Sequence, residues 1–157
     1  DCNYDCSLPF WAITKSNTSC CKIIFMDLIT SIKLLISGVI IGTILFQTTL
    51  SAPIVFKFLN PDQSKIYIRK IFPKIFSLIF LLGVGFLSLH FLAIDQPSIS
   101  LISAVTTVSF STICYLMIPA TNKARDEGND KKFKLLHRLS VILTMIVFFL
   151  NIIWVFI

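Results

Sequence analysis

Residues 117–140, with the sequence MIPATNKARDEGNDKKFKLLHRLS, form the longest strongly charged stretch of a chain that is otherwise mostly apolar. On each side of this stretch lies an apolar run of about 20 residues, the length of a helix that crosses the hydrocarbon core of a bilayer. The stretch is therefore expected to join two membrane-spanning helices as a hydrophilic loop.

The composition of the whole chain favours a membrane protein. Of the 157 residues, 55% are hydrophobic and 14% are charged, whereas an average soluble domain carries roughly 25% charged residues. The net charge of +6 could indicate nucleic-acid binding. The basic residues, however, lie in short loops between apolar runs, where membrane topology places them. We therefore predict the lipid bilayer as the partner and no nucleic acid.

Four apolar runs are long enough to span a membrane, at about residues 28–56, 73–94, 98–120 and 133–157. Backbone polar groups inside a bilayer have no water to bind, so each span must satisfy them within a helix. The prediction is an all-α fold, a four-transmembrane-helix antiparallel bundle formed by residues 26–157.

An amphipathic segment precedes the second span. Asn60, Pro61 and Gln63 have the pattern of a capped helix start. Lysine, arginine and isoleucine then recur at helical spacing. This segment, residues 61–72, is expected to lie as a cytoplasmic helix in the headgroup region, before Pro73 bends the chain into the membrane.

The first 25 residues differ from the rest of the chain. They hold four of the five cysteines, Cys2, Cys6, Cys20 and Cys21. We expect residues 1–25 to be a poorly ordered or non-native extension that precedes a natural start at Met26. The alternative is a disulfide or metal site, but the cysteine spacing does not match common zinc ligands and no histidine lies nearby.

The basic residues predict the orientation. The first and third loops hold five and six of the 14 Lys and Arg residues, and the second loop holds none. The positive-inside rule places these two loops in the cytoplasm and both termini outside. Lysine outnumbers arginine, and isoleucine, phenylalanine and asparagine are abundant, which favours an AT-rich bacterial genome and hence the inner (plasma) membrane.

Polar residues gather at the predicted cytoplasmic end because neighbouring helices run in opposite directions. The candidate polar cluster consists of Gln47, Thr48, Arg69, Asn122, Arg125, His137 and Ser140. Asn122 and His137 are expected to face each other across the hairpin of the third and fourth helices. The cluster is either a structural network or a binding site.

The two histidines are not expected to share a ligand. His90 lies 17 residues beyond Pro73, and His137 lies close to the start of the last helix, so their depths differ by about 20 Å. They cannot together bind one haem iron or metal ion within a chain. We expect His90 to bind a helix backbone or lipid headgroups near the outer surface.

Small residues indicate where helices approach one another. Gly38 and Gly42 form a Gly-x-x-x-Gly pattern that permits close contact with a neighbouring helix. A stripe at three- and four-residue steps in the third span consists of Ser100, Ser103, Thr107, Ser111 and Cys114. Such a stripe is typical of close helix packing, and a polar substrate path is the alternative.

Two sets of motifs carry a family resemblance. The first half contains Gly38, Gly42, Leu45-Phe46, Thr48, Pro53, Val55-Phe56, Ile71-Phe72-Pro73 and Phe76. The second half contains Pro119-Ala120-Thr121-Asn122-Lys123, Lys132-Phe133, Leu136-His137 and Ser140. Residues 26–157 resemble the transmembrane protein 205-like domain family, although Thr144 stands where many relatives carry Asn. The resemblance implies a four-pass membrane protein of largely uncharacterised function, with no catalytic residues to carry over.

These observations favour a non-enzymatic protein. No pattern of a known active site and no phosphate-binding glycine loop occurs in the sequence, so no catalytic residue, cofactor or metal is expected. We predict a structural or interaction module of the inner membrane that acts as a homo-oligomer or with a membrane-protein partner. The alternative is a small transporter or export accessory with a polar path near Gln47, Asn122 and His137. A haem or metal redox protein is the least favoured hypothesis.

Overall fold

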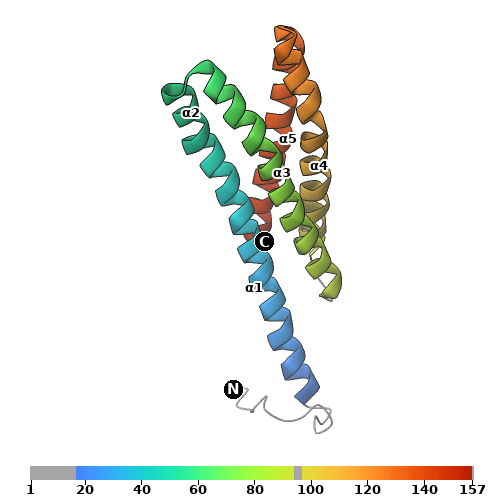
Figure 1. Ribbon diagram of the computed structural model, residues 1–157. Coiled ribbons are helices and arrows are strands. Elements are labelled where there is room, and N and C mark those ends of the chain that lie inside the picture. Colours follow the sequence, from blue (N-terminus) through green and yellow to red (C-terminus); the bar gives the residue numbers. More distant parts are fainter. Residues whose placement is uncertain (1–16, 94–96, 157) are drawn as a thin grey trace.

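The computed structural model describes residues 17–93 and 97–156, and within them the chain is helical without strands. The elements are α1 (Asn17–Leu45), η2 (Phe46–Ser51), α2 (Ala52–Phe58), α3 (Pro61–Leu92), α4 (Ser98–Asp126) and α5 (Asp130–Phe156) (Figure 1). Four helical rods in this part of the chain are long and apolar enough to cross a membrane. The predicted all-α four-helix architecture is confirmed.

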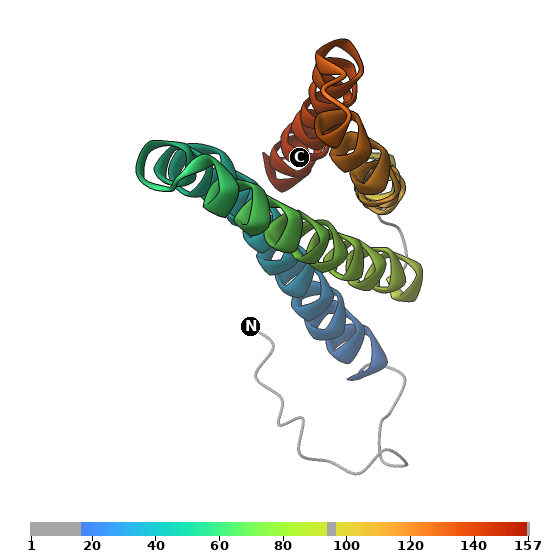
Figure 2. The ribbon, with the colours of Figure 1, turned by 45° about the horizontal axis from the view of Figure 1, so that its top comes forward.

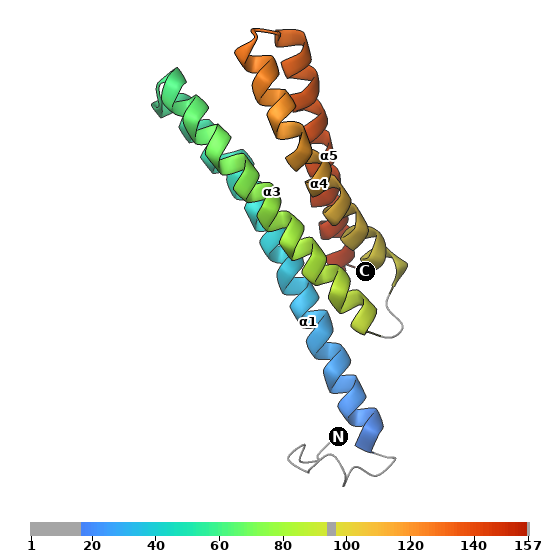
Figure 3. The same ribbon diagram turned by 45° about the vertical axis from the view of Figure 1, so that its right-hand side comes forward.

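The four rods form a ring. α4 packs against α3 and α5, while α1 packs against α3 and α5 from the other side. Across the ring, α1 and α4 have no Cα atoms within 8 Å of each other in the described residues, and the same holds for α3 and α5. Ring neighbours run antiparallel (Figures 1 and 3).

The two ends of the bundle differ. We call the end with the α2–α3 and α4–α5 connections the basic end, because it holds the two loops rich in lysine and arginine, and the other the opposite end. The two connections at the basic end lie apart, so the α1–α3 and α4–α5 hairpins splay there (Figures 2 and 3).

The first span begins earlier than expected. α1 starts at Asn17, and its first turns extend beyond the opposite end of the bundle (Figures 1 and 3). Residues 17–25 therefore belong to this helix. Residues 1–16, with Cys2 and Cys6, lie outside the described residues, and the expectation of a non-native extension stays a prediction.

The first span also contains an unexpected π-helical segment, η2, which holds Gln47 and Thr48. The Ala52 N–H donates to the Gln47 carbonyl, five residues back. The next residue, Pro53, has no N–H to donate. A local π adjustment is one way in which a membrane helix satisfies the carbonyls that a proline leaves free.

The basic segment before the second span is part of a longer helix. α3 starts at the predicted capping box, in which the Asn60 N–H donates to Gln63 Oε1 at 3.4 Å. The helix then continues without interruption through Pro73 to Leu92. The predicted amphipathic segment, residues 61–72, is therefore the first part of the second rod. Pro73 does not interrupt the helix, because a proline in a packed membrane helix costs one backbone bond that neighbouring groups can replace.

Among the glycines of the described residues, Gly83, outside the Gly-x-x-x-Gly pattern, lies closest to a neighbouring helix. A Cβ atom on Gly83 of α3 would lie 2.9 Å from Thr107 Cγ2 of α4. A Cβ atom on Gly38 or Gly42 would meet nothing within 4 Å. The pattern in α1 therefore does not mediate contact within this chain, contrary to expectation.

Candidate functional site

The predicted polar cluster is spread over the basic end. The most compact part joins α4 to α5: the Arg125 guanidinium carbon lies 4.9 Å from the centre of the Phe133 ring. The His137 ring stacks on Phe133, with centroids 5.9 Å apart and planes inclined by 4°. Arg125 and His137 are both exposed. The Phe133 ring, which was not part of the predicted cluster, connects these two side chains.

Arg69 takes part in a second contact, between α3 and α4. Its Nη2 atom lies 2.6 Å from Asp126 Oδ1, and Lys65 Nζ lies at the same distance from that oxygen. One carboxylate therefore ties the two hairpins together at the basic end. Glu127, by contrast, pairs only with Lys123 of its own helix, at 3.7 Å.

The remaining members of the cluster do not converge. Thr48 Oγ1 donates to the Ile44 carbonyl, and Ser140 Oγ donates to the His137 carbonyl, so both hydroxyls serve their own helices. Gln47 and Asn122 are half-buried. Within the described residues no hydrogen bond joins Asn122 to His137. The exposed imidazole points to Phe133 instead.

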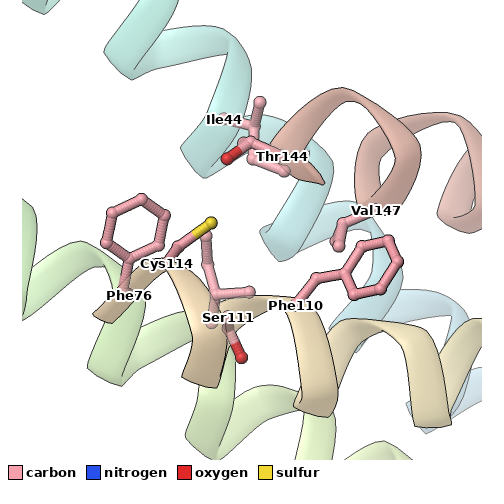
Figure 4. Close-up of a pocket in the computed structure, with 8 residues that line it drawn as sticks. Ile44, Phe76, Phe110, Ser111, Cys114, Thr144 and Val147 are labelled. Atoms are coloured by element: carbon pink, nitrogen blue, oxygen red, sulfur yellow. The ribbon is translucent and has the colours of Figure 1, made fainter. Parts of the chain in front are cut away.

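A small, partly open cavity lies deeper in the bundle (Figure 4). Its volume is about 10 Å³, enough for about one water molecule. The lining residues are Ile44, Phe76, Ile79, Phe110, Ser111, Cys114, Thr144 and Val147. Thr144 Oγ1 donates to the Ser140 carbonyl at 2.8 Å, so this hydroxyl is satisfied within α5.

The most unusual polar group is Lys33 of α1, whose side chain is 0% exposed. Its Nζ atom lies 4.5 Å from the centre of the Trp154 ring and 5.2 Å from that of Phe86. The two rings meet edge to face at 5.7 Å. Aromatic faces attract a cation, and the attraction grows when water is excluded. An ammonium group is thus placed inside the bundle between α3 and α5.

Other polar side chains of the four helices are buried or form hydrogen bonds between helices. Asn151 Nδ2 donates to Thr107 Oγ1 at 3.0 Å, and His90 Nδ1 lies 3.1 Å from Ser100 Oγ. Three buried polar groups have no hydrogen-bond partner within the described residues: Ser37 Oγ, Ser103 Oγ and Trp154 Nε1. We call the set the Lys33 layer: Lys33, Ser37, Phe86, His90, Ser100, Ser103, Thr107, Asn151 and Trp154.

The comparison with known families adds one match. Residues 35–130 match a family described as a domain of unknown function, DUF4149. The chain belongs to the DUF4149 family. The matched segment runs from α1 to the start of α5 and covers more than half of the chain. No curated protein and no solved structure matches.

The matched part of this DUF4149 protein contains most of both polar regions. It includes Arg69, Asn122 and Arg125 of the basic end, and Phe86 to Thr107 of the Lys33 layer. It begins after Lys33 and stops before His137, Asn151 and Trp154. The match agrees with a four-pass membrane protein of unknown function. It does not carry the transmembrane protein 205-like name, which stays a resemblance.

Lys33 lies near the beginning of the first predicted span, where a lysine commonly extends toward the membrane surface rather than into the bundle. A signal for its burial exists in the sequence. Lys33, Ser37, Ile40 and Ile44 follow at four-, three- and four-residue steps, so the lysine shares a helix face with apolar residues. All four of these side chains are buried. His90 belongs to the same layer and bonds Ser100, whereas we expected a backbone group or lipid.

Proposed function

We propose that this DUF4149 protein is a non-enzymatic membrane module that acts through contacts at its basic end. We further propose that it lies in the inner (plasma) membrane with the basic end in the cytoplasm and both termini outside. One observation carries the first proposal: the exposed side chains of Arg125 and His137 both contact the Phe133 ring, and we call these three residues the stack.

The chemistry of this stack suits a protein partner. Arginine and aromatic side chains are enriched at the centres of protein interfaces, because they offer flat, rigid surfaces that exclude water. The first turns of α5 also carry Lys131, Lys132 and Lys134, which would attract an acidic surface. A second copy of this chain or another membrane protein is the expected partner.

The test compares assembly with solute flux. His137→Ala removes one ring from the contact with Phe133. Lys131→Ala, on the same helix, is the matched control because Lys131 makes no ring contact in the described structure. In nanodiscs, His137→Ala is expected to shift the mass distribution of the complex toward single chains, and Lys131→Ala is not.

Flux measurements in proteoliposomes complete this test. We expect the native protein and both variants to show the same background flux of small solutes. Solute flux in the native protein that His137→Ala abolishes would contradict the interaction module. An unchanged oligomer distribution in His137→Ala would remove the stack from the proposed interface.

A second candidate function, a small transporter or export accessory, is favoured by the Lys33 layer. Ionisable residues buried in membrane helices commonly mark ion or substrate pathways. On this proposal Lys33→Met, which keeps the length of the side chain and removes its charge, abolishes flux, while His137→Ala leaves flux intact. Equal flux in native protein, Lys33→Met and empty vesicles would exclude this candidate.

A further inference from the structure

An open groove with a volume of about 420 Å³ lies along the first turns of α3. It is lined by Gln63, Ile66, Tyr67, Lys70, Ile71 and Lys74. These positions recur at three- and four-residue steps, so they share one helix face. Lys65 and Arg69, which bind Asp126 of α4, lie on the other side of the helix.

The two lysines of the groove form an unneutralised pair. Lys70 and Lys74 are both exposed, and neither has an acidic partner within 4.0 Å in the described part of the chain. Residues four apart are neighbours on a helix surface, and like charges at this spacing repel each other. An anion held between the two ammonium groups would convert this repulsion into attraction.

The groove also lies where the chain enters the membrane. Lys74 is followed by residues 75–89, which contain no charged residue. Beside the lysines, Ile66 is 57% exposed and Tyr67 is 36% exposed. The Tyr67 hydroxyl is within 3.2 Å of Ser51 Oγ, which fixes the ring against the first rod. Amines next to exposed apolar and tyrosine side chains are typical of the membrane interface.

We propose that this surface, the Lys70 groove, binds the headgroup of an anionic phospholipid. The phosphate lies between the Lys70 and Lys74 ammonium groups, and the glycerol backbone lies against Ile71. The groove faces away from α4, so in a membrane its neighbour is lipid rather than another helix of this chain. Basic surfaces next to a membrane helix attract anionic lipid headgroups in this way.

The experiment titrates the full chain, purified in a neutral detergent, with phosphatidylglycerol or phosphatidylcholine and counts bound lipids by native mass spectrometry. Each lysine near an anionic headgroup is expected to tighten binding about 5-fold, so Lys70→Gln/Lys74→Gln should bind phosphatidylglycerol about 30-fold more weakly. Lys131→Gln/Lys132→Gln is the control, because it removes the same charge from the first turn of α5 at the basic end.

A preference for phosphatidylglycerol that the groove variant loses and the control keeps supports the proposal. Equal losses in both double variants would show a response to net charge and overturn it. Equal binding of the two lipids by the native protein would also overturn the proposal. Displacement by soluble glycerol phosphate or by an acidic peptide at equal concentration would assign the groove to another ligand. If the double variant does not fold, Lys70→Gln and Lys74→Gln are measured singly, each with an expected loss of about 5-fold.

Discussion

Lys33 shows how one residue can be stabilised inside an apolar bundle. A lysine at the centre of a membrane helix costs about 2.5–3.5 kcal/mol on insertion scales, and this is an upper value for Lys33, which lies in the first third of its span. Here the ammonium lies between the Phe86 and Trp154 rings, and a desolvated cation–π contact contributes about 2 kcal/mol. The two effects are of similar size, so the fold can hold a buried charge. A charge kept at such a cost is the strongest residue-level indication of a role beyond packing.

At the same scale, the bond between Asn151 and Thr107 can be measured. We expect Asn151→Leu and Thr107→Val to show a coupling of about 0.6 kcal/mol, and at most about 1.7 kcal/mol, because membrane hydrogen bonds compete with other partners in the unfolded state. A double-mutant cycle on unfolding in detergent measures this coupling. Additive effects of the two substitutions would contradict the 3.0 Å hydrogen bond.

At the scale of the element, packing between α3 and α4 depends on the absence of a side chain at Gly83. The nearest atoms include the Val108 backbone N, 3.3 Å from the position of a Cβ, and the backbone cannot move aside as a flexible side chain can. The stripe on α4 faces inward as predicted, since Ser100, Ser103, Thr107, Ser111 and Cys114 are all buried.

Gly83→Ala is therefore expected to destabilise the bundle by about 1–3 kcal/mol, the usual cost of overpacking. Gly42→Ala is the matched control, because a Cβ there meets nothing within 4 Å. Its effect should lie within about 0.5 kcal/mol of zero. Thermal or denaturant unfolding of the two variants in one detergent measures the difference. Equal destabilisation by both would disprove the close α3–α4 approach.

For the whole molecule, the main feature is the splay of two helical hairpins at the basic end (Figures 2 and 3). Asp126 joins them through Lys65 and Arg69, and these contacts are solvent-exposed. Exposed ion pairs are screened by salt and add little to stability. We expect these ion pairs to affect the distance between the hairpins rather than the free energy of unfolding.

Asp126→Asn should widen the distance between the hairpin tips without a marked change in thermal stability. Spin labels at positions 62 and 129, in a chain whose own cysteines are replaced by serine, would report this distance. Glu127→Gln is the control, because Glu127 pairs within α4. An unchanged distance distribution in Asp126→Asn would show that the ion pairs do not hold the hairpins.

The proposed orientation is also a property of the whole chain. A cysteine at position 129, in the α4–α5 connection, should react with a membrane-impermeant reagent only after the cytoplasmic side is opened, and a reporter after Ile157 should be found outside. Both expected results follow from the positions of the basic residues in the first and third predicted loops. A cytoplasmic reporter at Ile157 would reverse the orientation.

The sequence by itself determined the four spans, the capped start of α3 and the inward stripe of α4, because these depend on apolar length and helical period. It could not determine that Pro73 continues a helix, that η2 widens before Pro53, or that Gly83 packs while Gly38 and Gly42 do not. Those outcomes depend on which neighbour each helix face meets. Likewise, Lys33, Phe86 and Trp154 come from three helices, and only the packing of the bundle brings these side chains together.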